Sequence, residues 1–439
     1  MGHLGHLKAE YHELVERLDA NSVGFPEPTT EKSRQGWCEI LEILYTPEDA
    51  ELAAKLPVLP AGLTAISKRT GIPRDALEKR LVKMAEKGLV MDIVNPKTKK
   101  AKYLLSPPVV GFFEFSLMRA KDSIPKKRMA QALDAYCHGD PTFASEVFKG
   151  DTVIGRAMVN EDALDTEQRP DILDWERATH VILEAKTIAV SICYCRHKNE
   201  HLGKCCDAPM ETCLSVNMGA DFVIRNKFGR QINSDEAMEI MVKSRQSGLV
   251  QIADNVQDRP SYICNCCGCC CGQLMAINEY DLDAVNPSNY LASVDGDSCS
   301  GCSRCSRSCP IGAISMTSVR QAGRRNNRLM AVVKHDRCIG CGVCTTSCTK
   351  THAITMKQRT IRPHVPLNSI EKTLRMAMER GRLHHFIFDQ GAGRGPQFLN
   401  KVVQALCTFS PVEKVLANKQ LQSRFINYML AKTKGKLPI

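Results

Sequence analysis

The residues of this chain with the most specific chemistry are its cysteines, of which there are 22 among 439 residues. Eight of them repeat one spacing, C-x2-C-x2-C-x3-C, in two runs: Cys299, Cys302, Cys305 and Cys309, then Cys338, Cys341, Cys344 and Cys348. Thiolates are soft ligands that favour zinc or iron–sulfur clusters. A pair of zinc knuckles would not require the third and fourth cysteines to recur at identical offsets, so the repeat favours two iron–sulfur clusters.

The two runs, the first of which continues as Pro-Ile-Gly-Ala-Ile, resemble the bacterial-type ferredoxins that hold two [4Fe-4S] clusters. The resemblance covers about residues 290–356 and implies a ferredoxin-like dicluster domain. It also implies that the last cysteine of each run crosses over to the other cluster. One cluster would then be held by Cys299, Cys302, Cys305 and Cys348, and the other by Cys338, Cys341, Cys344 and Cys309.

The loops of these runs carry glycines where backbone must approach a cluster closely and adopt positive φ, namely Gly301, Gly340 and Gly342. The chain departs from the ferredoxin pattern at Thr349, where proline is usual. The long spacer between the runs predicts a longer hairpin, which would carry Arg324, Arg325 and Arg328. Neither departure removes a ligand.

Eleven further cysteines lie upstream in two segments. The first offers four thiolates, enough for one cubane: Cys193, Cys195, Cys206 and Cys213, with Cys206 preferred to Cys205 because Asp-Ala-Pro follows it. The second segment contains six cysteines in eight residues, which are Cys264, Cys266, Cys267, Cys269, Cys270 and Cys271. Cys264, Cys267 and Cys270 have the cubane spacing in one frame, which leaves the other three as spare ligands.

Three arrangements of these eleven cysteines are open: two additional cubanes, one larger or non-cubane cluster that uses both segments, or a zinc site beside a redox dithiol. Arg196, His197 and Lys204 are close to the thiolates in sequence, where their charge and hydrogen bonds would raise a cluster's potential. His197 is also a weaker candidate ligand. The order C-x-C-R, C-x2-P, C-L and C-N-C-C ahead of a two-cluster domain is similar to a group of ferredoxin-like proteins of anaerobes, over about residues 60–430.

Residues 60–105 have a different plan, with no cysteine. A short helix over 63–70, a turn at Gly71, a second helix over 73–87 and a hairpin over 89–105 resemble a winged helix-turn-helix. As a DNA reader it would use basic residues of the second helix and the hairpin tip: Arg74, Lys79, Arg80, Lys83, Lys97, Lys99 and Lys100. Asp75 and Glu78 on the same helix disfavour that role, so we expect a protein contact or a structural remnant.

Positive charge is concentrated in the tail. The net charge is +11, and from Lys357 onward 15 Lys and Arg stand against 4 Asp and Glu, so the rest of the chain is neutral. This favours a docking surface for an acidic protein, or a peripheral contact with an acidic membrane surface, over general nucleic-acid binding. We expect helices over 367–380, 396–408, 411–418 and 421–431, and an ordinary tight connection at the glycine-rich turn 391–395.

The expected fold is therefore α+β and multidomain. It comprises residues 1–106, helical with a winged-helix-like module; 107–289, a cysteine-rich α/β domain; 290–356, the dicluster domain; and 357–439, a basic helical tail. No apolar run is long enough to span a membrane, and the N-terminus lacks an apolar signal core, which predicts a cytoplasmic protein, with the inner membrane face as a peripheral alternative. The isolated Cys38, Cys137 and Cys407 are expected to be buried apolar residues.

These features predict an iron–sulfur electron-transfer protein, a subunit or partner of a larger anaerobic oxidoreductase. It would relay single electrons through two [4Fe-4S] clusters and one or two further clusters. Two alternatives stay open. One is a redox-responsive winged-helix transcription regulator, and the other is a reductase with an atypical catalytic cluster at Cys264–Cys271. Over residues 107–189, no nucleophile is paired with a base at a diagnostic spacing.

Overall fold

The computed structural model describes residues 7–164, 172–319 and 328–387. The chain divides into two compact units, each described here by itself. Within the described ranges, the first unit comprises residues 7–152, 225–228 and 368–387, and the second comprises residues 153–224 and 229–367. The predicted mixture of helices and strands is confirmed. The four predicted domain boundaries stay predictions.

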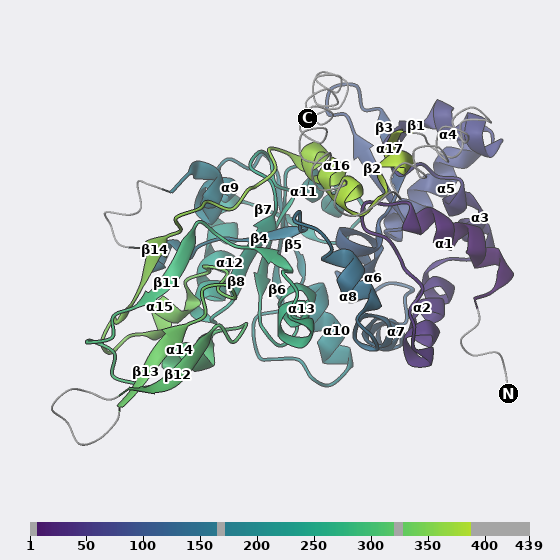
Figure 1. The fold of residues 1–439 in the computed structure, drawn as a ribbon. Helices are drawn as coiled ribbons and strands as arrows, with labels where there is room; N and C mark the ends of the chain where they lie inside the picture. The colour runs from purple at the N-terminus through teal and green to yellow at the C-terminus, as the bar shows by residue number, and fades with distance from the viewer. Residues whose placement is uncertain (1–6, 165–171, 320–327, 388–439) are drawn as a thin grey trace, which may run out of the picture. The chain divides into compact units, whose positions relative to one another are not determined.

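Helices dominate the first unit (Figure 1). They are α1 (His12–Asp19), α2 (Glu31–Leu44), α3 (Pro47–Ala54), α6 (Phe113–Leu117), α7 (Lys126–His138), α8 (Thr142–Val147), α16 (Ser369–Glu379) and α17 (Leu383–Ile387), with short turns at Ala9–Tyr11 and Pro108–Phe112. Helices α2 and α7 pack closely because Gly36 has no side chain: a Cβ there would lie 2.5 Å from the Ala132 carbonyl oxygen. Beside them, Phe25 packs against Trp37 and Tyr136 in an aromatic core.

The helix and hairpin elements predicted for residues 60–105 are present. They are α4 (Leu63–Thr70), α5 (Arg74–Glu86), β2 (Val90–Val94) and β3 (Ala101–Leu105), and β1 (Ala61–Gly62) completes a three-stranded antiparallel sheet of order β1-β3-β2. Gly71 ends α4 in the left-handed conformation, with φ of 73°. Strand β2 is fixed by a distant segment, since Arg225 and Asn226 both bind the Asp92 carboxylate, at 2.5 and 2.9 Å.

The second unit is built on a seven-stranded sheet of order β10-β4-β8-β9-β6-β5-β7. Its strands are β4 (Gly155–Ala157), β5 (Ile188–Ile192), β6 (Glu211–Val216), β7 (Arg230–Ile232), β8 (Val250–Asp254), β9 (Tyr262–Cys266) and β10 (Val285–Asn286), paired antiparallel except for β4 with β10. Residues of α9 (Ala178–Leu183) and α12 (Ser234–Gln246) pack with apolar residues of β5 and β6 in one core. The central strands are thereby held rigidly, and cysteines lie on or beside their ends.

The remaining helices of this sheet follow strands that contain a cysteine or directly precede one. Helix α10 (Tyr194–His201) begins directly after β5, α11 (Met218–Arg225) follows β6, and α13 (Gly272–Tyr280) begins six residues after the end of β9. Short turns lie at Glu161–Ala163 and Asp174–Glu176.

Residues 290–358 form two small antiparallel ribbons with two short helices (Figure 1). Strand β11 (Tyr290–Val294) pairs with β14 (Ile354–Gln358), and β12 (Ile314–Val319) pairs with β13 (Arg328–Val333). Helix α14 (Arg304–Ser308) follows the first cysteine loop, and α15 (Val343–Ser347) follows the second. The predicted hairpin is thus present in its strands, whereas Arg324 and Arg325 lie outside the described residues.

The first predicted tail helix is present as α16. The other three predicted tail helices, the glycine-rich turn 391–395 and Cys407 lie outside the described residues. Cys38 is buried as predicted, and Cys137 is half-buried. Of the helices in the described ranges, none has the length and apolar character needed to cross a membrane.

Candidate metal centres

The two cysteine runs of residues 299–348 share one loop conformation. Gly301 and Gly340 have φ of 70° and 69°, as their predicted role requires. No side chain fits at either position: a Cβ would lie 2.4 Å from the Leu329 carbonyl oxygen at Gly301, and 2.1 Å from that of Tyr290 at Gly340. The loops therefore fold tightly enough to aim several thiols at one point.

The thiols gather in the two crossed sets that the ferredoxin resemblance implies. One cavity is lined by Cys299, Cys302, Cys305 and Cys348, together with apolar residues such as Met316 and Ile354. In the other set, burial, together with the nearby Cys309 and Cys338, raises the pKa of Cys341 to about 12. Buried thiols packed together remain protonated unless a metal neutralises their charge, so this second set fits a cluster-bound state.

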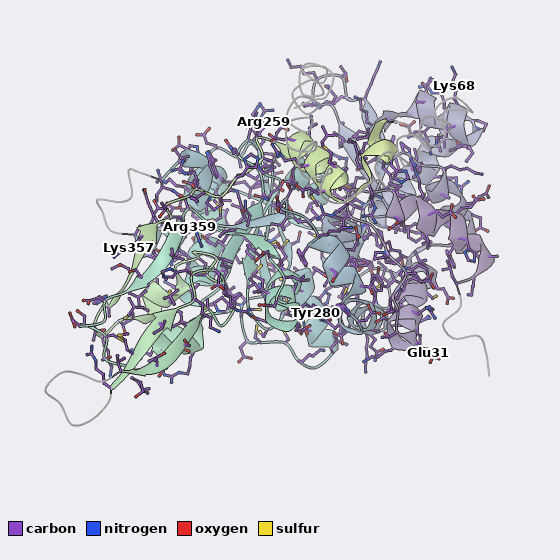
Figure 2. All side chains as sticks on the ribbon, viewed as in Figure 1. Glu31, Lys68, Arg259, Tyr280, Lys357 and Arg359 are labelled. Carbon is purple, nitrogen blue, oxygen red and sulfur yellow. The ribbon has the colours of Figure 1, made fainter. Side chains whose placement is uncertain are left out.

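Arginines fix the backbone around both sets. Arg328 of the spacer donates to the carbonyl oxygen of Cys299 at 3.4 Å. Arg359, labelled in Figure 2, directly follows β14. Its guanidinium donates to the carbonyl oxygens of Cys338 and, at 3.0 Å, of Ser288. Thr349, which replaces the usual proline, accepts a hydrogen bond from Arg304 at 2.9 Å. Through this hydrogen bond, Thr349 links the two cysteine runs.

A family model described as a 4Fe-4S dicluster domain matches residues 298–353. The chain contains a ferredoxin-like dicluster domain. No curated protein and no solved structure showed a significant similarity to the chain. The matched residues contain eight of the cysteines, and the match does not extend to the eleven upstream cysteines.

Six of the upstream cysteines form one group, here called the strand-end cysteines: Cys193, Cys195, Cys213, Cys264, Cys266 and Cys271. Their thiols hydrogen-bond in sequence, Cys193 to Cys195, Cys195 to Cys271, Cys271 to Cys266, Cys266 to Cys264 and Cys264 to Cys213. Hydrogen bonds from Cys195 and Cys266 lower the pKa of Cys271 to about 5. The pKa of Cys264 is lowered as well, whereas burial and neighbouring thiols raise the pKa of the other four, so negative charge is concentrated on two of the six cysteines.

The strand register explains why these six come together. Cys213 lies on β6 and Cys264 on β9, which pair with each other, and Cys193 follows β5 on the other side of β6. Cys264 and Cys266 are two residues apart on one strand, so both side chains point to the same face. The group draws on both upstream segments.

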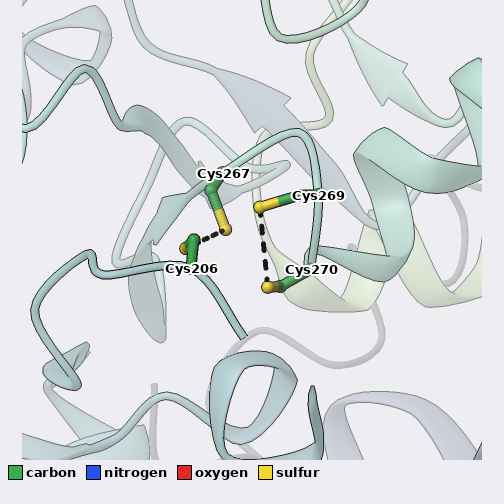
Figure 3. A group of neighbouring side chains, drawn as sticks. All are labelled: Cys206, Cys267, Cys269 and Cys270. Atoms are coloured by element: carbon green, nitrogen blue, oxygen red, sulfur yellow. Dashed lines mark hydrogen bonds between the residues drawn. The ribbon is translucent and has the colours of Figure 1, made fainter. Parts of the chain in front are cut away.

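Four other upstream cysteines form a second, tighter group, here called the loop cysteines: Cys206, Cys267, Cys269 and Cys270 (Figure 3). Their sulfur atoms all lie within 4.8 Å of one another. The Sγ atoms of Cys206 and Cys267 are 3.6 Å apart, as are those of Cys269 and Cys270. Cys205 lies outside this group, and its thiol donates to the carbonyl oxygen of Cys206 at 3.2 Å.

The structure thus divides the upstream cysteines differently from the sequence spacing. Cys206, predicted to join Cys193, Cys195 and Cys213, lies with the loop cysteines. The predicted frame of Cys264, Cys267 and Cys270 is split between the two groups. The reason is that Cys264 lies on β9, whereas Cys267 and Cys270 lie in the turn between β9 and α13.

Arg196 lies between the two upstream groups and is fully buried. Its guanidinium donates to the Asn265 carbonyl oxygen at 3.0 Å and to the Thr212 hydroxyl, and lies 4.0 Å from Cys267 Sγ. Burial alone lowers the pKa of Arg196, but the thiolates of Cys193 and Cys267 reverse this and raise it above its usual value. The neighbouring His197 lies 3.1 Å from His201 through the Nε2 atoms of both rings.

The loop cysteines lie against the dicluster domain. Gly268 is so close to Pro310, which follows Cys309, that a Cβ would lie 2.4 Å from the Pro310 carbonyl oxygen. Asn278 of α13 donates to the carbonyl oxygens of Pro310 at 2.9 Å and of Gly268 at 3.4 Å. The sequence did not predict the contacts of Gly268 and Asn278 with Pro310, because no local pattern marks a contact between segments about 40 residues apart.

Arg337 adds a second link between α13 and the dicluster domain. This residue directly precedes Cys338, and its guanidinium donates to the carbonyl oxygens of Ile311 at 2.6 Å and of Ile277 at 3.0 Å. It also forms an ion pair with Asp281. An arginine next to a cluster ligand was the one signal in the sequence that pointed to this contact.

Proposed function

We propose that this protein transfers single electrons between its upstream cysteine site and its dicluster domain, as a subunit or dedicated partner of a larger oxidoreductase. A bound iron–sulfur cluster stores and releases one electron. The observation that carries the proposal is the contact of Gly268 with Pro310, which joins the loop of the upstream cysteines to the loop of Cys309. Electron tunnelling weakens steeply with distance, so this contact favours exchange between the two regions.

We propose the strand-end cysteines as the ligands of a further iron–sulfur cluster. Six thiols exceed the four that one cubane takes, which favours a larger or non-cubane cluster among the open alternatives. All six are drawn from strands and helix starts that surround one end of the central sheet, so the chain supplies a preformed cradle. Arg196 beside this cradle would stabilise the more negative, reduced state and so raise the potential of the bound group.

For residues 61–105 we propose a winged-helix-like module that acts as a structural or protein-contact element. Two observations support this role over DNA reading. Arg80 of α5 donates to the Glu48 carbonyl oxygen at 2.7 Å, and Lys87 forms an ion pair with Asp49 at 2.7 Å. One of the side chains that would contact DNA, Arg80, is thus already engaged at α3, the end of α5 is tied to α3 through Lys87, and strand β2 is held through Asp92.

For the basic tail we propose an acidic redox partner protein as the ligand, with an acidic membrane surface as the alternative outcome. Part of the tail's positive charge is used internally, since Arg380 donates to the Val147 carbonyl oxygen at 2.7 Å and Arg382 forms ion pairs with Glu146 and Asp19. The docking charge would then come from the basic residues after 387. Binding to such a partner should weaken strongly as salt is raised.

The test is an EPR-monitored redox titration of the anaerobically purified protein. Electron transfer predicts reversible one-electron signals from the dicluster domain and a separate signal that disappears in Cys213→Ser. If the EPR signal of the upstream site is absent, or if that site is reduced only during turnover of a substrate, the result would contradict electron transfer between the two regions. It would favour the alternative of a reductase with an atypical catalytic cluster.

A further inference from the structure

The loop cysteines have sulfur spacings that suit one metal ion. A tetrahedral site with metal–sulfur bonds of about 2.3 Å has sulfur–sulfur edges of about 3.8 Å. The two closest pairs, Cys206 with Cys267 and Cys269 with Cys270, are each separated by 3.6 Å, and all four sulfur atoms lie within 4.8 Å of one another (Figure 3). We propose that Cys206, Cys267, Cys269 and Cys270 bind a single thiophilic divalent ion, zinc or iron, in a mononuclear tetrathiolate site.

The dicluster domain gives an internal comparison. In a cubane, each thiolate binds a different iron, so the four sulfur atoms are held apart by the whole cluster. Among the described residues, none of the eight dicluster cysteines belongs to a metal-ligating group as tight as the loop cysteines. The same chain therefore contains widely spaced thiol sets that fit clusters and one compact set that fits a single ion.

The charge of such a site has a nearby counterpart. Four thiolates around a divalent ion carry a net charge of −2. The buried guanidinium of Arg196 lies 4.0 Å from Cys267 Sγ and is itself held by Asn265 and Thr212, so its position is fixed independently of the ion. A fixed cation at this distance stabilises the anionic site.

The local chain path makes the set accessible to a metal while keeping it rigid. Cys269 is exposed and Cys270 is buried, so the site lies at the edge of the domain, where an ion can enter. The Cys271 amide donates to the Cys267 carbonyl oxygen at 3.2 Å, which closes the turn, and Gly268 is held against Pro310. The turn thus has few ways to rearrange around a larger cluster.

This interpretation also explains six cysteines in eight residues. The segment Cys264–Cys271 supplies two interleaved sets, because Cys264, Cys266 and Cys271 join the strand-end group while the three between them in the turn join Cys206. The inference does not rest on electron transfer. Zinc would make the site structural, and iron would make it a further one-electron centre.

The test uses the full chain, purified anaerobically, and the double variant Cys206→Ser/Cys269→Ser. Metal analysis and a sulfide assay should show a loss of about one zinc or one iron per chain with no loss of sulfide. Loss of about four irons with an equal amount of sulfide would overturn the proposal. Cys137→Ser, which alters a half-buried cysteine of α7 outside both upstream groups, is the control and should lose no metal.

A second measurement on the unmodified protein covers the case in which the double variant fails to fold. X-ray absorption at the zinc edge, or Mössbauer spectroscopy for iron, should show one centre with four sulfur ligands at about 2.3 Å and no neighbouring metal. The absence of any such centre would overturn the proposal. The EPR signals of the dicluster domain are read separately, so failure of this site and failure of the electron-transfer function are distinguishable.

Discussion

The contact between Gly268 and Pro310 can be tested by adding one methyl group. In Gly268→Ala the new Cβ would lie 2.4 Å from the Pro310 carbonyl oxygen, about 1 Å closer than ordinary van der Waals contact allows. Because the obstacle is backbone on a cysteine loop, it cannot rotate away. Overpacking of this kind typically costs about 1–3 kcal/mol, which for a unit of roughly 200 residues corresponds to a drop in Tm of about 2–12 °C.

Gly272→Ala is the matched control in the same segment. Gly272 is the first residue of α13, and no atom lies within 4 Å of the position that its Cβ would take. Alanine there should be neutral or stabilising by up to about 1 kcal/mol, because it reduces the freedom of the unfolded chain and favours the helix. Thermal unfolding of both holoproteins under anaerobic conditions gives the comparison. Equal Tm values for the two variants would refute the close approach of the two loops.

Three further outcomes are expected. Cys348→Ser should remove the cluster held with Cys299, and with it about four irons, while the EPR signal of the other dicluster centre survives. Loss of that other EPR signal would contradict the crossed ligand sets. Arg196→Met should lower the potential of a cluster on the strand-end cysteines by about 40–90 mV in a redox titration and Arg196→Lys by less, because Arg196 interacts with the charges of Cys193 and Cys266 and the loss of such a charge is worth about 1–2 kcal/mol; equal shifts would exclude a charge effect. In metal-free protein the pKa of Cys341 is raised from 9.0 to about 12. The protonated thiol therefore contributes its full stabilisation of the folded state below pH 9, and this contribution is lost as the pH rises towards 12. The free energy of unfolding, measured against pH, should show this loss in the apoprotein and not in Cys341→Ser.

The dicluster domain was predictable because its signal is local and repeated. Three cysteines of each set lie within seven residues, and the glycines that bend the loops lie between them. The helices and hairpin of residues 61–105 were predictable for a similar reason, since Gly71 and Pro73 mark a turn and a helix start in the sequence itself.

The division of the upstream cysteines was not predictable from spacing. It depends on which strands pair, because β6 and β9 bring Cys213 and Cys264 together across about 50 residues of chain. Spacing could not separate the two groups, because Cys267 and Cys269 are two residues apart just as Cys264 and Cys266 are. The contacts of Asn278 and of Arg225 depend on tertiary packing and left no mark in the sequence.

The central claim is that iron–sulfur chemistry in this chain extends beyond the dicluster domain into the upstream cysteines. Iron and acid-labile sulfide content of the anaerobically purified protein tests it most directly. The account predicts about twelve or more irons per chain with comparable sulfide, and a fall to about eight irons in a Cys213→Ser/Cys264→Ser variant. About eight irons in the unmodified protein, unchanged in that variant, would contradict it.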